Sequence, residues 1–376
     1  MIYFDNAAST KMCQPALQAL MYWSEHCLNP SSSYKAADAD RNVIAQTREK
    51  IAKVLNCSDN EVYFTSGGSE SDNWAFYTAT EALSNYGRHI IISAIEHPAV
   101  SKCAEFYRRH GYEVSILPVD AEGIVDLQAL EKLLRPETIL VSVMTANNEV
   151  GSLQPIAEIG ALLRERPHTL FHTDAVQAFM HENIDVKAAA VDLLSLSGHK
   201  FNGPKGIGAF YMNEDKRNKF NLPAFILGGS QERERRAGTV PVPLIAAMGA
   251  AIDFHLQHYD EFHKHIADLQ AYFIQQLREN FPDCQINGSL TRRLVNNINV
   301  CLPDVAGEEA LILLDFADIL ASHGSACASG SLDPSPVLLA MGKSLEQAGS
   351  SLRFTLGYEN TAEEVNQVIA ALKNLA

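Results

Sequence analysis

Residues 195–208 read Ser195-Leu196-Ser197-Gly198-His199-Lys200-Phe201-Asn202-Gly203-Pro204-Lys205-Gly206-Ile207-Gly208, and they begin at the end of an apolar run that predicts a strand. This stretch places one lysine, Lys200, among small, hydroxylic and glycine residues. Schiff-base chemistry needs an amine of depressed pKa beside an aldehyde, and a strand end followed by glycines can confine a lysine in that way. The alternative is a solvated lysine in a Gly/Pro-rich loop. Lys200 is therefore a candidate for covalent attachment of a cofactor.

The segment belongs to a series of short β-rich runs that alternate with helical patterns between residues 60 and 215. Most of these runs are nearly continuous apolar stretches, as expected when helices cover both faces of a sheet. Predicted helices that separate them include Ser71–Leu83, Ala99–His110 and Ile156–Arg166. The pattern predicts an α/β domain. Its expected strands are Glu61–Thr65, His89–Ile95, Glu113–Val119, Ile139–Ala146, Thr169–His172, Val191–Leu196 and Ile207–Met212.

A second, smaller α+β unit is predicted after this region. A long helical stretch from about Leu244 to Glu279 leaves the first domain, and no linker long enough to separate two units is present. The elements expected after it are a strand at Val295–Leu302, a helix near Glu308–Asp315, a strand at Ser351–Leu356 and a final helix. We expect a large domain over residues 15–255, a small domain built from residues 1–14 and 256–376, and a cleft between them.

The composition indicates an ordered, acidic, globular protein. The 376 residues are 47% hydrophobic and 20% charged, and 45 acidic residues against 30 basic ones give a net charge of -15. This charge disfavours direct binding to nucleic acid or to an anionic membrane. No signal-like N-terminus and no apolar run near the roughly 18 residues of a membrane helix are seen. Seven cysteines without framework spacing suit a reducing compartment, so we expect a cytoplasmic protein.

A carboxylate follows another predicted strand in the stretch His172-Thr173-Asp174-Ala175-Val176-Gln177. Pyridoxal phosphate acts as an electron sink when its ring nitrogen stays protonated, which requires a carboxylate facing that nitrogen. Asp174 could fill this role, and Gln177 could hydrogen-bond the ring hydroxyl. The competing interpretation makes Asp174 a helix N-cap.

Two more strand-to-helix junctions carry polar groups. In Thr65-Ser66-Gly67-Gly68-Ser69-Glu70-Ser71-Asp72-Asn73 the glycines let backbone N–H groups approach a phosphate, and Ser69 and the helix dipole complete an anion site. A plain tight turn with a serine cap is the alternative. Glu96-His97-Pro98 places an imidazole, His97, at the same edge of the sheet, where it could stack on the pyridine ring. A lone histidine is more often structural.

Taken together these blocks resemble the NifS/IscS group of cysteine desulfurases in the class V aminotransferase superfamily. The resemblance covers nearly the whole chain. Further blocks that carry it are Asp5-Asn6-Ala7-Ala8, Asn29-Pro30-Ser31-Ser32, Asn147-Asn148-Glu149-Val150-Gly151, Gln231-Glu232-Arg233, Arg236-Ala237-Gly238-Thr239 and Gly324-Ser325-Ala326-Cys327. It implies the type I fold of pyridoxal-phosphate-dependent transferases, a large domain with a mostly parallel sheet covered by helices plus a smaller α+β domain.

The resemblance also implies roles for individual residues. Lys200 would hold the cofactor, Asp174 would face the pyridine nitrogen, His97 would stack on the ring, and Asn148 and Gln177 would contact the ring hydroxyl. The expected phosphate ligands are Gly68, Ser69, Ser197 and His199, with Thr239 reaching the phosphate of the neighbouring subunit in a homodimer. Arg353 would grip the substrate carboxylate beside Asn148, because its planar fork suits that task; without the family context it could be an ordinary strand arginine.

Cys327 determines the expected reaction. It lies among small residues in Ser322-His323-Gly324-Ser325-Ala326-Cys327-Ala328-Ser329-Gly330-Ser331, where an accessible thiolate is as plausible as a buried, inert thiol. We expect L-cysteine as the substrate, alanine as the product, and a persulfide on Cys327 that passes sulfur to an acceptor or iron-sulfur scaffold protein. No intrinsic metal site is expected, although Cys327 could transiently ligate a nascent iron-sulfur cluster.

Two alternatives remain open. A selenocysteine lyase or another class V enzyme would share Lys200 and Asp174, and Cys327 argues against a transaminase. A sulfur carrier with vestigial catalytic residues is the alternative from outside the enzymes. Tyr34 and Lys35 stand where close relatives often have a histidine, and the chain ends at Ala376 without the longer tail of IscS-like members, so the surface that docks a partner is not predicted.

Overall fold

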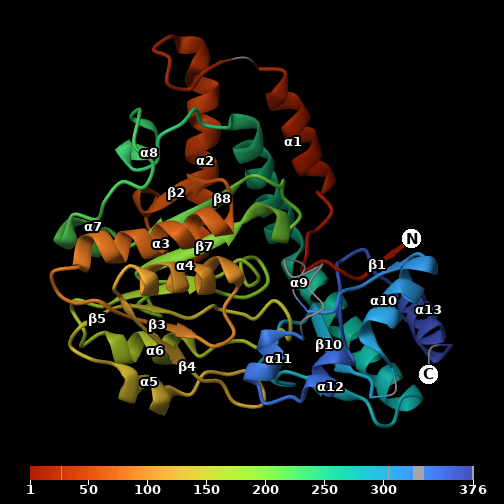
Figure 1. The fold of residues 1–376 in the computed structure, drawn as a ribbon. Coiled ribbons are helices and arrows are strands. Elements are labelled where there is room, and N and C mark those ends of the chain that lie inside the picture. The colour runs from red at the N-terminus through yellow and green to blue at the C-terminus, as the bar shows by residue number, and fades with distance from the viewer. Residues whose placement is uncertain (27, 304, 325–333, 375–376) are drawn as a thin grey trace.

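The computed structural model describes residues 1–26, 28–303, 305–324 and 334–374. Its centre is a seven-stranded sheet with the order β2-β8-β7-β6-β5-β3-β4, covered by helices on both faces (Figure 1). All neighbouring strands are parallel except the two pairs that β8 makes with β2 and β7. The strands are β2 (Val62–Thr65), β3 (His89–Ser93), β4 (Glu113–Leu117), β5 (Thr138–Ser142), β6 (Leu170–Asp174), β7 (Leu193–Ser197) and β8 (Gly208–Met212).

Each predicted strand of this domain is confirmed, with ends that move by a few residues. Strands β2, β3 and β5 to β8 are buried along their whole length, which explains their apolar sequences. β8 runs antiparallel to β7 because no helix connects the two, only the Gly/Pro-rich loop that carries Lys200. The loop packs closely: a Cβ atom at Gly208 would meet the carbonyl oxygen of Leu196 at 2.4 Å.

Helices form two layers around the sheet. On one face α3 and α4 bury residues such as Trp74 and Val100 against Ile90 and Phe210. On the other face α2, α6 and the first half of α9 pack against Val141. The predicted helices correspond to α3, α4, α6 and α9. The structure adds α1, α2, α5, α7 and α8, for which the sequence predicted no range. Their bounds are α1 (Gln14–Ser24), α2 (Asp38–Leu55), α3 (Gly68–Leu83), α4 (Pro98–Arg109), α5 (Leu127–Leu133), α6 (Ile156–Leu163), α7 (Glu214–Phe220), α8 (Gln231–Glu234) and α9 (Val242–Asn280).

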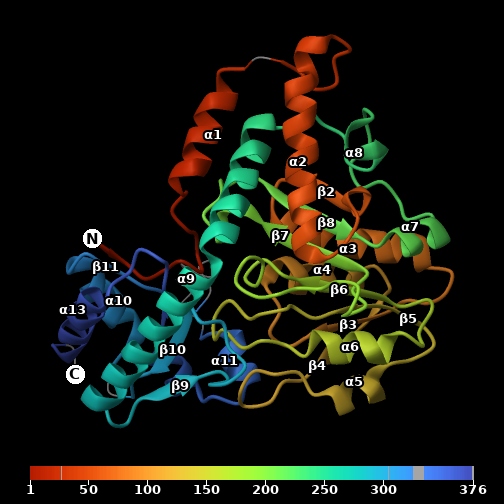
Figure 2. The same ribbon diagram turned by 180° about the vertical axis from the view of Figure 1, so that it is seen from behind.

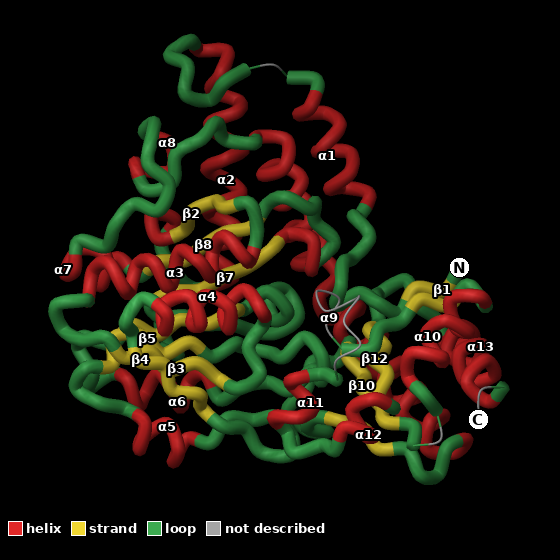
Figure 3. The backbone as a smooth tube through the Cα atoms, in the orientation of Figure 1, coloured by secondary structure: helices red, strands yellow, loops and turns green. Residues whose placement is uncertain are grey.

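The C-terminal unit has a small antiparallel sheet of order β12-β10-β9. Its strands β10 and β12 are labelled in Figure 3. The predicted strands and helices here correspond to β10, β12, α10 and α13. The N-terminus joins this unit, since β1 pairs in parallel with β11. The elements are β1 (Ile2–Tyr3), β9 (Gln285–Asn287), β10 (Asn297–Cys301), α10 (Gly307–Phe316), β11 (Ile319–Leu320), α11 (Pro336–Ala340), α12 (Leu345–Gly349), β12 (Ser351–Thr355) and α13 (Ala362–Lys373).

Helix α9 links the two units and is 39 residues long. Ile245 and Ile252 in its first half belong to the core of the large sheet, whereas Phe273 in its second half packs on Phe4 and Phe354 in the other core. Figure 2 shows the helix running from one unit to the other. The domain limits at residues 14/15 and 255/256 stay a prediction. Across the described ranges every helix is too short or too polar to span a bilayer.

Candidate active site

The carboxyl ends of the parallel strands open into a cavity of about 180 Å³. Loops after β2, β3, β5, β6 and β7 reach it from the large domain, and β12 reaches it from the small one. Parallel strands deliver their following loops to one edge of a sheet, so residues far apart in sequence meet there. The predicted residues that line this cavity are Gly68, Ser69, His97, Asn148, Asp174, Gln177, Ser197, His199, Lys200 and Arg353.

Lys200 ends the short 3₁₀ turn that follows β7. Its side-chain nitrogen Nζ donates hydrogen bonds to the carbonyl oxygens of Ala7 at 2.5 Å and Ala8 at 3.0 Å. The N-terminal segment thus forms one wall of the cavity beside the lysine. The sequence blocks contained both alanines but gave neither a role, because a backbone acceptor leaves no mark in residue type.

Asp174 and His97 face each other across the cavity. Oδ1 of Asp174 accepts a hydrogen bond from the backbone N–H of Val176 at 2.8 Å, and burial raises the pKa of the carboxyl, opposed mainly by His97. Nδ1 of His97 accepts from the backbone N–H of Ala99 at 3.1 Å and so caps α4. Burial lowers the pKa of His97, which favours a neutral ring with its proton on Nε2. Asp174 thus caps a turn rather than a helix, so the N-cap interpretation is wrong, and its role opposite a pyridine nitrogen stays a prediction.

The N-terminus of α3 forms the other end of the cavity. Its first residue is Gly68, and its N-cap is Gly67, which has no side chain to occupy the free backbone N–H groups. A Cβ atom at Gly68 would meet Val176 Cγ2 at 2.6 Å, so this close approach requires glycine. Ser69 and Ser197 add hydroxyl groups at the cavity wall. These hydroxyls, the free backbone N–H groups and the positive end of the helix dipole suit the binding of a phosphate.

His199 also lines this end of the cavity. Its Nδ1 lies 3.2 Å from Ser9 Oγ, and burial, with help from Lys200 and Lys205, lowers its pKa to about 4. The ring is therefore neutral at physiological pH and can donate one hydrogen bond. It cannot provide a positive charge to a phosphate.

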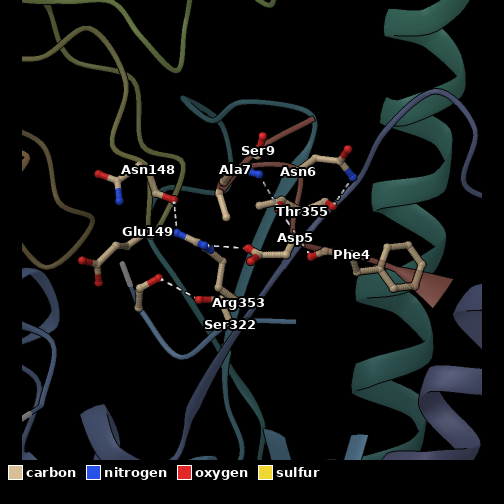
Figure 4. A network of polar contacts seen from close by, with 12 residues as sticks. Phe4, Asp5, Asn6, Ala7, Ser9, Asn148, Glu149, Ser322, Arg353 and Thr355 are labelled. Atoms are coloured by element: carbon tan, nitrogen blue, oxygen red, sulfur yellow. Dashed lines mark hydrogen bonds and ion pairs between the residues drawn. The ribbon is translucent and has the colours of Figure 1, made fainter. Parts of the chain in front are cut away.

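Arg353 lies in the middle of β12 and is 1% exposed. Its Nη2 pairs with Asp5 Oδ1 at 2.7 Å, and its Nη1 donates to the carbonyl oxygen of Asn148 at 3.0 Å (Figure 4). The guanidinium therefore stands at the cavity wall with an acidic partner already in place. The sequence blocks contained Asp5, but nothing in them assigned it this contact.

Asp72 is a second buried carboxyl group at the cavity. It is 1% exposed, and its Oδ1 has no hydrogen-bond partner within the described part of the chain. Burial raises its pKa well above the usual range, and Asp174 adds to the rise. Ligand atoms of Asp72, His97 and Asp174 lie within 4.8 Å of one another, a spacing that a cation could also use. The expectation of no intrinsic metal stays a prediction.

Three predicted site residues need separate mention. The side chain of Gln177 donates to the carbonyl oxygen of Ala7 at 2.9 Å, so its contact to a ring hydroxyl stays a prediction. Thr239 is exposed and does not line the cavity of its own subunit. Cys327 lies outside the described residues, which resume at 334 after Gly324. The roles of all three remain expectations.

The cavity fits pyridoxal phosphate in its chemistry. A helix N-terminus with two serine hydroxyls suits the phosphate, Lys200 supplies an amine, and a buried carboxylate, Asp174, suits a protonated ring nitrogen. His97 offers a flat neutral ring at the side.

Comparison with known proteins gives a consistent result. The family model for the class V aminotransferases matches residues 2–368. The curated cysteine desulfurase IscS of Clostridium botulinum (strain Kyoto / Type A2) is 42% identical over 377 aligned positions, which cover 100% of this chain and 94% of that protein. The cysteine desulfurase IscS of Methanosarcina thermophila is 43% identical, with 100% and 91% covered.

Solved structures agree with this result. A NifS-like protein superposes with a TM-score of 0.91 at 33% identity and covers 99% of this chain and 98% of its own. SspA, solved in complex with cysteine, gives a TM-score of 0.83 at 36% identity, with 96% and 100% covered. The similarity therefore extends over both units of the fold.

Proposed function

We propose a residue-level mechanism for this chain, which belongs to the class V aminotransferase family and, within it, to the cysteine desulfurases that use pyridoxal phosphate. The observation that carries the proposal is the convergence of Lys200, Asp174, His97 and Arg353 on one cavity. An amine, a buried carboxylate, a neutral imidazole and a guanidinium are the groups needed to hold the cofactor and an amino acid together.

The cofactor, when bound, supplies an electron sink for the substrate α-carbon. Arg353 binds the substrate carboxylate and orients the amino acid, as its planar fork allows. Lys200 would hold the cofactor before the substrate arrives, and its amine would take the proton from the α-carbon. Asp174 would face the ring nitrogen, and Gly68, Ser69, Ser197 and His199 would hold the phosphate.

His97 takes the proton of the substrate thiol. Its lowered pKa means that the ring is neutral near pH 7. Its acceptor nitrogen is Nδ1, so this proton transfer requires Nδ1 to release the backbone N–H of Ala99. Its backbone cap on α4 fixes the ring plane beside Asp174.

Cys327 receives the sulfur. Its thiolate attacks the sulfur of L-cysteine, an S–S bond forms, the C–S bond breaks, and the electron pair left on carbon is protonated to give alanine. The other described cysteines support this choice, because burial raises the pKa of each thiol, to about 12 for Cys57 and Cys103. A thiol with such a pKa is a poor nucleophile at neutral pH.

Several further roles rest on the same proposal. Thr239, exposed on its own subunit, contacts the phosphate of the neighbouring subunit in a homodimer. The sulfur passes from Cys327 to an acceptor or an iron-sulfur scaffold protein, and Cys327 transiently ligates the nascent cluster. The enzyme works in the cytoplasm without a direct contact to membrane or nucleic acid. The large domain spans residues 15–255, and the small domain comprises residues 1–14 and 256–376.

The proposal is tested by substrate choice and by labelling. Purified holoenzyme is supplied with L-cysteine or L-selenocysteine under a reductant, and alanine is counted together with sulfide or selenide. A cysteine desulfurase turns over L-cysteine and needs Cys327. Turnover of L-selenocysteine alone, unchanged in Cys327→Ala, would make the chain a selenocysteine lyase. Transfer of sulfur-35 label from cysteine to candidate acceptor proteins then identifies the physiological acceptor.

A further inference from the structure

The contact between Asp5 and Arg353 carries a consequence for substrate binding. Arg353 is a permanently charged group that is 1% exposed, and such a group is stable only beside an opposite charge. Asp5 provides that charge at 2.7 Å, from a side chain that is 18% exposed. The two residues lie at opposite ends of the chain and meet where the N-terminal segment runs along β12.

The position of Asp5 is fixed by its own backbone. Its carbonyl oxygen accepts a hydrogen bond from Tyr3 Oη at 3.0 Å and another from the backbone N–H of Ala8 at 2.9 Å. Next to it, the backbone N–H of Ala7 donates to Thr355 Oγ1 at 2.8 Å. The carboxylate is therefore held against Arg353 by a network that does not depend on bound substrate (Figure 4).

Glu149 is the other acidic group whose charge interacts with Arg353. Its carboxyl group accepts a hydrogen bond from Ser335 at 2.5 Å, and it is buried. Burial raises its pKa, which disfavours its negative charge. Asp5 is thus the carboxylate in direct contact with the guanidinium.

The guanidinium also has donors to spare. Nη1 and Nη2 are engaged by Asn148 and Asp5, whereas Nε is buried and has no hydrogen-bond acceptor among the described residues. A substrate carboxylate that reaches Arg353 adds a second negative charge beside Asp5. Like charges at this range repel each other, so the carboxylate of Asp5 weakens the binding of the substrate carboxylate.

We propose that Asp5 is a specificity residue, whose carboxylate competes with the carboxylate of the amino acid for the guanidinium of Arg353. The inference rests on the proposed role of Arg353 in substrate binding. Asp5 limits the affinity for amino acids, which also helps the product alanine to leave. Removal of its charge strengthens the binding of amino acids that have a carboxylate and leaves those without one unaffected.

The test compares L-alanine with L-alaninamide, which has the same side chain and no carboxylate. The change in visible absorption of the holoenzyme is titrated with each ligand in the wild type, Asp5→Asn and Asp5→Ser. In both variants we expect the Kd of L-alanine to fall about three- to tenfold and that of L-alaninamide to stay within about twofold. The matched control is Glu359→Gln, which removes an exposed negative charge paired with Lys11 and should change neither Kd.

Every other outcome counts against the proposal or against the role of Arg353 on which it rests. Unchanged or weaker L-alanine binding in a folded Asp5→Asn holoenzyme, or a parallel change for both ligands, overturns the proposal. If both neutral variants fail to fold, as shown by thermal melting, Asp5 serves the fold alone and the proposal is overturned as well. Arg353→Gln separates this from the proposed function: if that variant keeps the preference for L-alanine over L-alaninamide, Arg353 does not bind the carboxylate at all.

Discussion

The side-chain nitrogen of Lys200 lies 2.5 Å from the carbonyl oxygen of Ala7, 193 residues away in the chain. Further contacts tie the same segment to the cavity, because Lys200 also donates to Ala8, Gln177 donates to Ala7, and Asp5 pairs with Arg353. The first residues of the protein thus complete the site that the large sheet begins. Residues from both ends of the chain therefore line the cavity beside Lys200, Ala7 and Ala8 from the N-terminus and Arg353 from β12.

Replacement of Cys327 by serine should stop sulfur transfer and leave the cofactor in place. Serine has nearly the same size and is a much weaker nucleophile toward sulfur, so we expect alanine formation under a reductant to fall at least about 100-fold. The visible absorption of the holoenzyme should be unchanged. Cys57→Ser, at a thiol whose pKa is about 12, is the control and should keep wild-type activity. Normal alanine production by Cys327→Ser would refute the assigned role.

Replacing Asp72 by asparagine should change turnover and cofactor affinity much less than replacing Asp174. Burial raises the pKa of Asp72 well above its usual range and Asp174 raises it further, so we expect the proton of the pair on Asp72. Asp72→Asn therefore resembles the native protonated group, and we expect cofactor affinity and turnover to stay within about threefold. Asp174→Asn removes the charge opposite the ring nitrogen and should lower turnover about 100-fold or more. The reverse ranking of the two variants, measured as kcat and as cofactor Kd, would exchange their roles.

Ionisation of Glu96 should lower the free energy of unfolding at alkaline pH. Burial raises its pKa to about 8, while Ser93 Oγ and the backbone N–H of Met144 donate to its Oε1. The folded state therefore keeps a proton that the unfolded state releases near its ordinary pKa of about 4.5. The resulting stabilisation is complete below about pH 4.5 and is lost as the pH rises through about 8. Between these values the free energy of unfolding falls by up to about 1.4 kcal/mol per pH unit.

Urea unfolding from pH 5 to 9 checks this expectation. Glu96→Gln should show a shallower decline in the free energy of unfolding than the wild type. Glu165→Gln, at an exposed position, is the control and should follow the wild-type curve. Parallel curves for Glu96→Gln and the wild type would mean that Glu96 is ionised in the folded protein.

The buried ion pair between Arg48 and Glu232 should strongly stabilise the loop before Thr239. Both side chains are buried, and two hydrogen bonds of 2.8 Å join them. Glu232 starts a run of three residues with positive φ, from 46° to 63°, which is strained for side chains other than glycine. Arg48→Met leaves the carboxylate buried without its partner and should cost about 3–5 kcal/mol in urea unfolding.

A double variant shows whether the charge is the cause. Arg48→Met with Glu232→Leu removes both charges and should recover part of the loss. Glu105→Gln breaks an exposed pair with Arg108 and should cost less than about 1 kcal/mol. An equal, small effect of Arg48→Met and Glu105→Gln would contradict a structural role for the buried pair.

Much of the fold was predictable because its strands are buried on both faces. Continuous apolar runs such as His89–Ile95 marked β3 and its neighbours, and the strand-to-helix junctions placed Asp174, His97 and Lys200 at one edge. The short strands β1, β9 and β11 could not be found, because two or three residues carry no periodic signal.

The missing parts of the site have physical reasons as well. Ala7 and Ala8 act through backbone carbonyls, which every residue type has. Asp5 and Asp72 stood in the sequence blocks that carry the family resemblance, but a carboxylate acquires its role from its partner in space. Arg353 and Asp5 are 348 positions apart, and only the pairing of the N-terminal segment with β12 joins them.

The central claim is that an amine at Lys200 and a thiol at Cys327 act on one molecule of L-cysteine. Mass spectrometry of the peptide that contains Cys327, taken after brief exposure of the holoenzyme to L-cysteine without reductant, tests it most directly. We predict one additional sulfur atom on Cys327 for each alanine released in the first turnover, and neither product in Lys200→Ala. Alanine release with Cys327 unmodified, or sulfur on Cys327 in Lys200→Ala, would contradict the account.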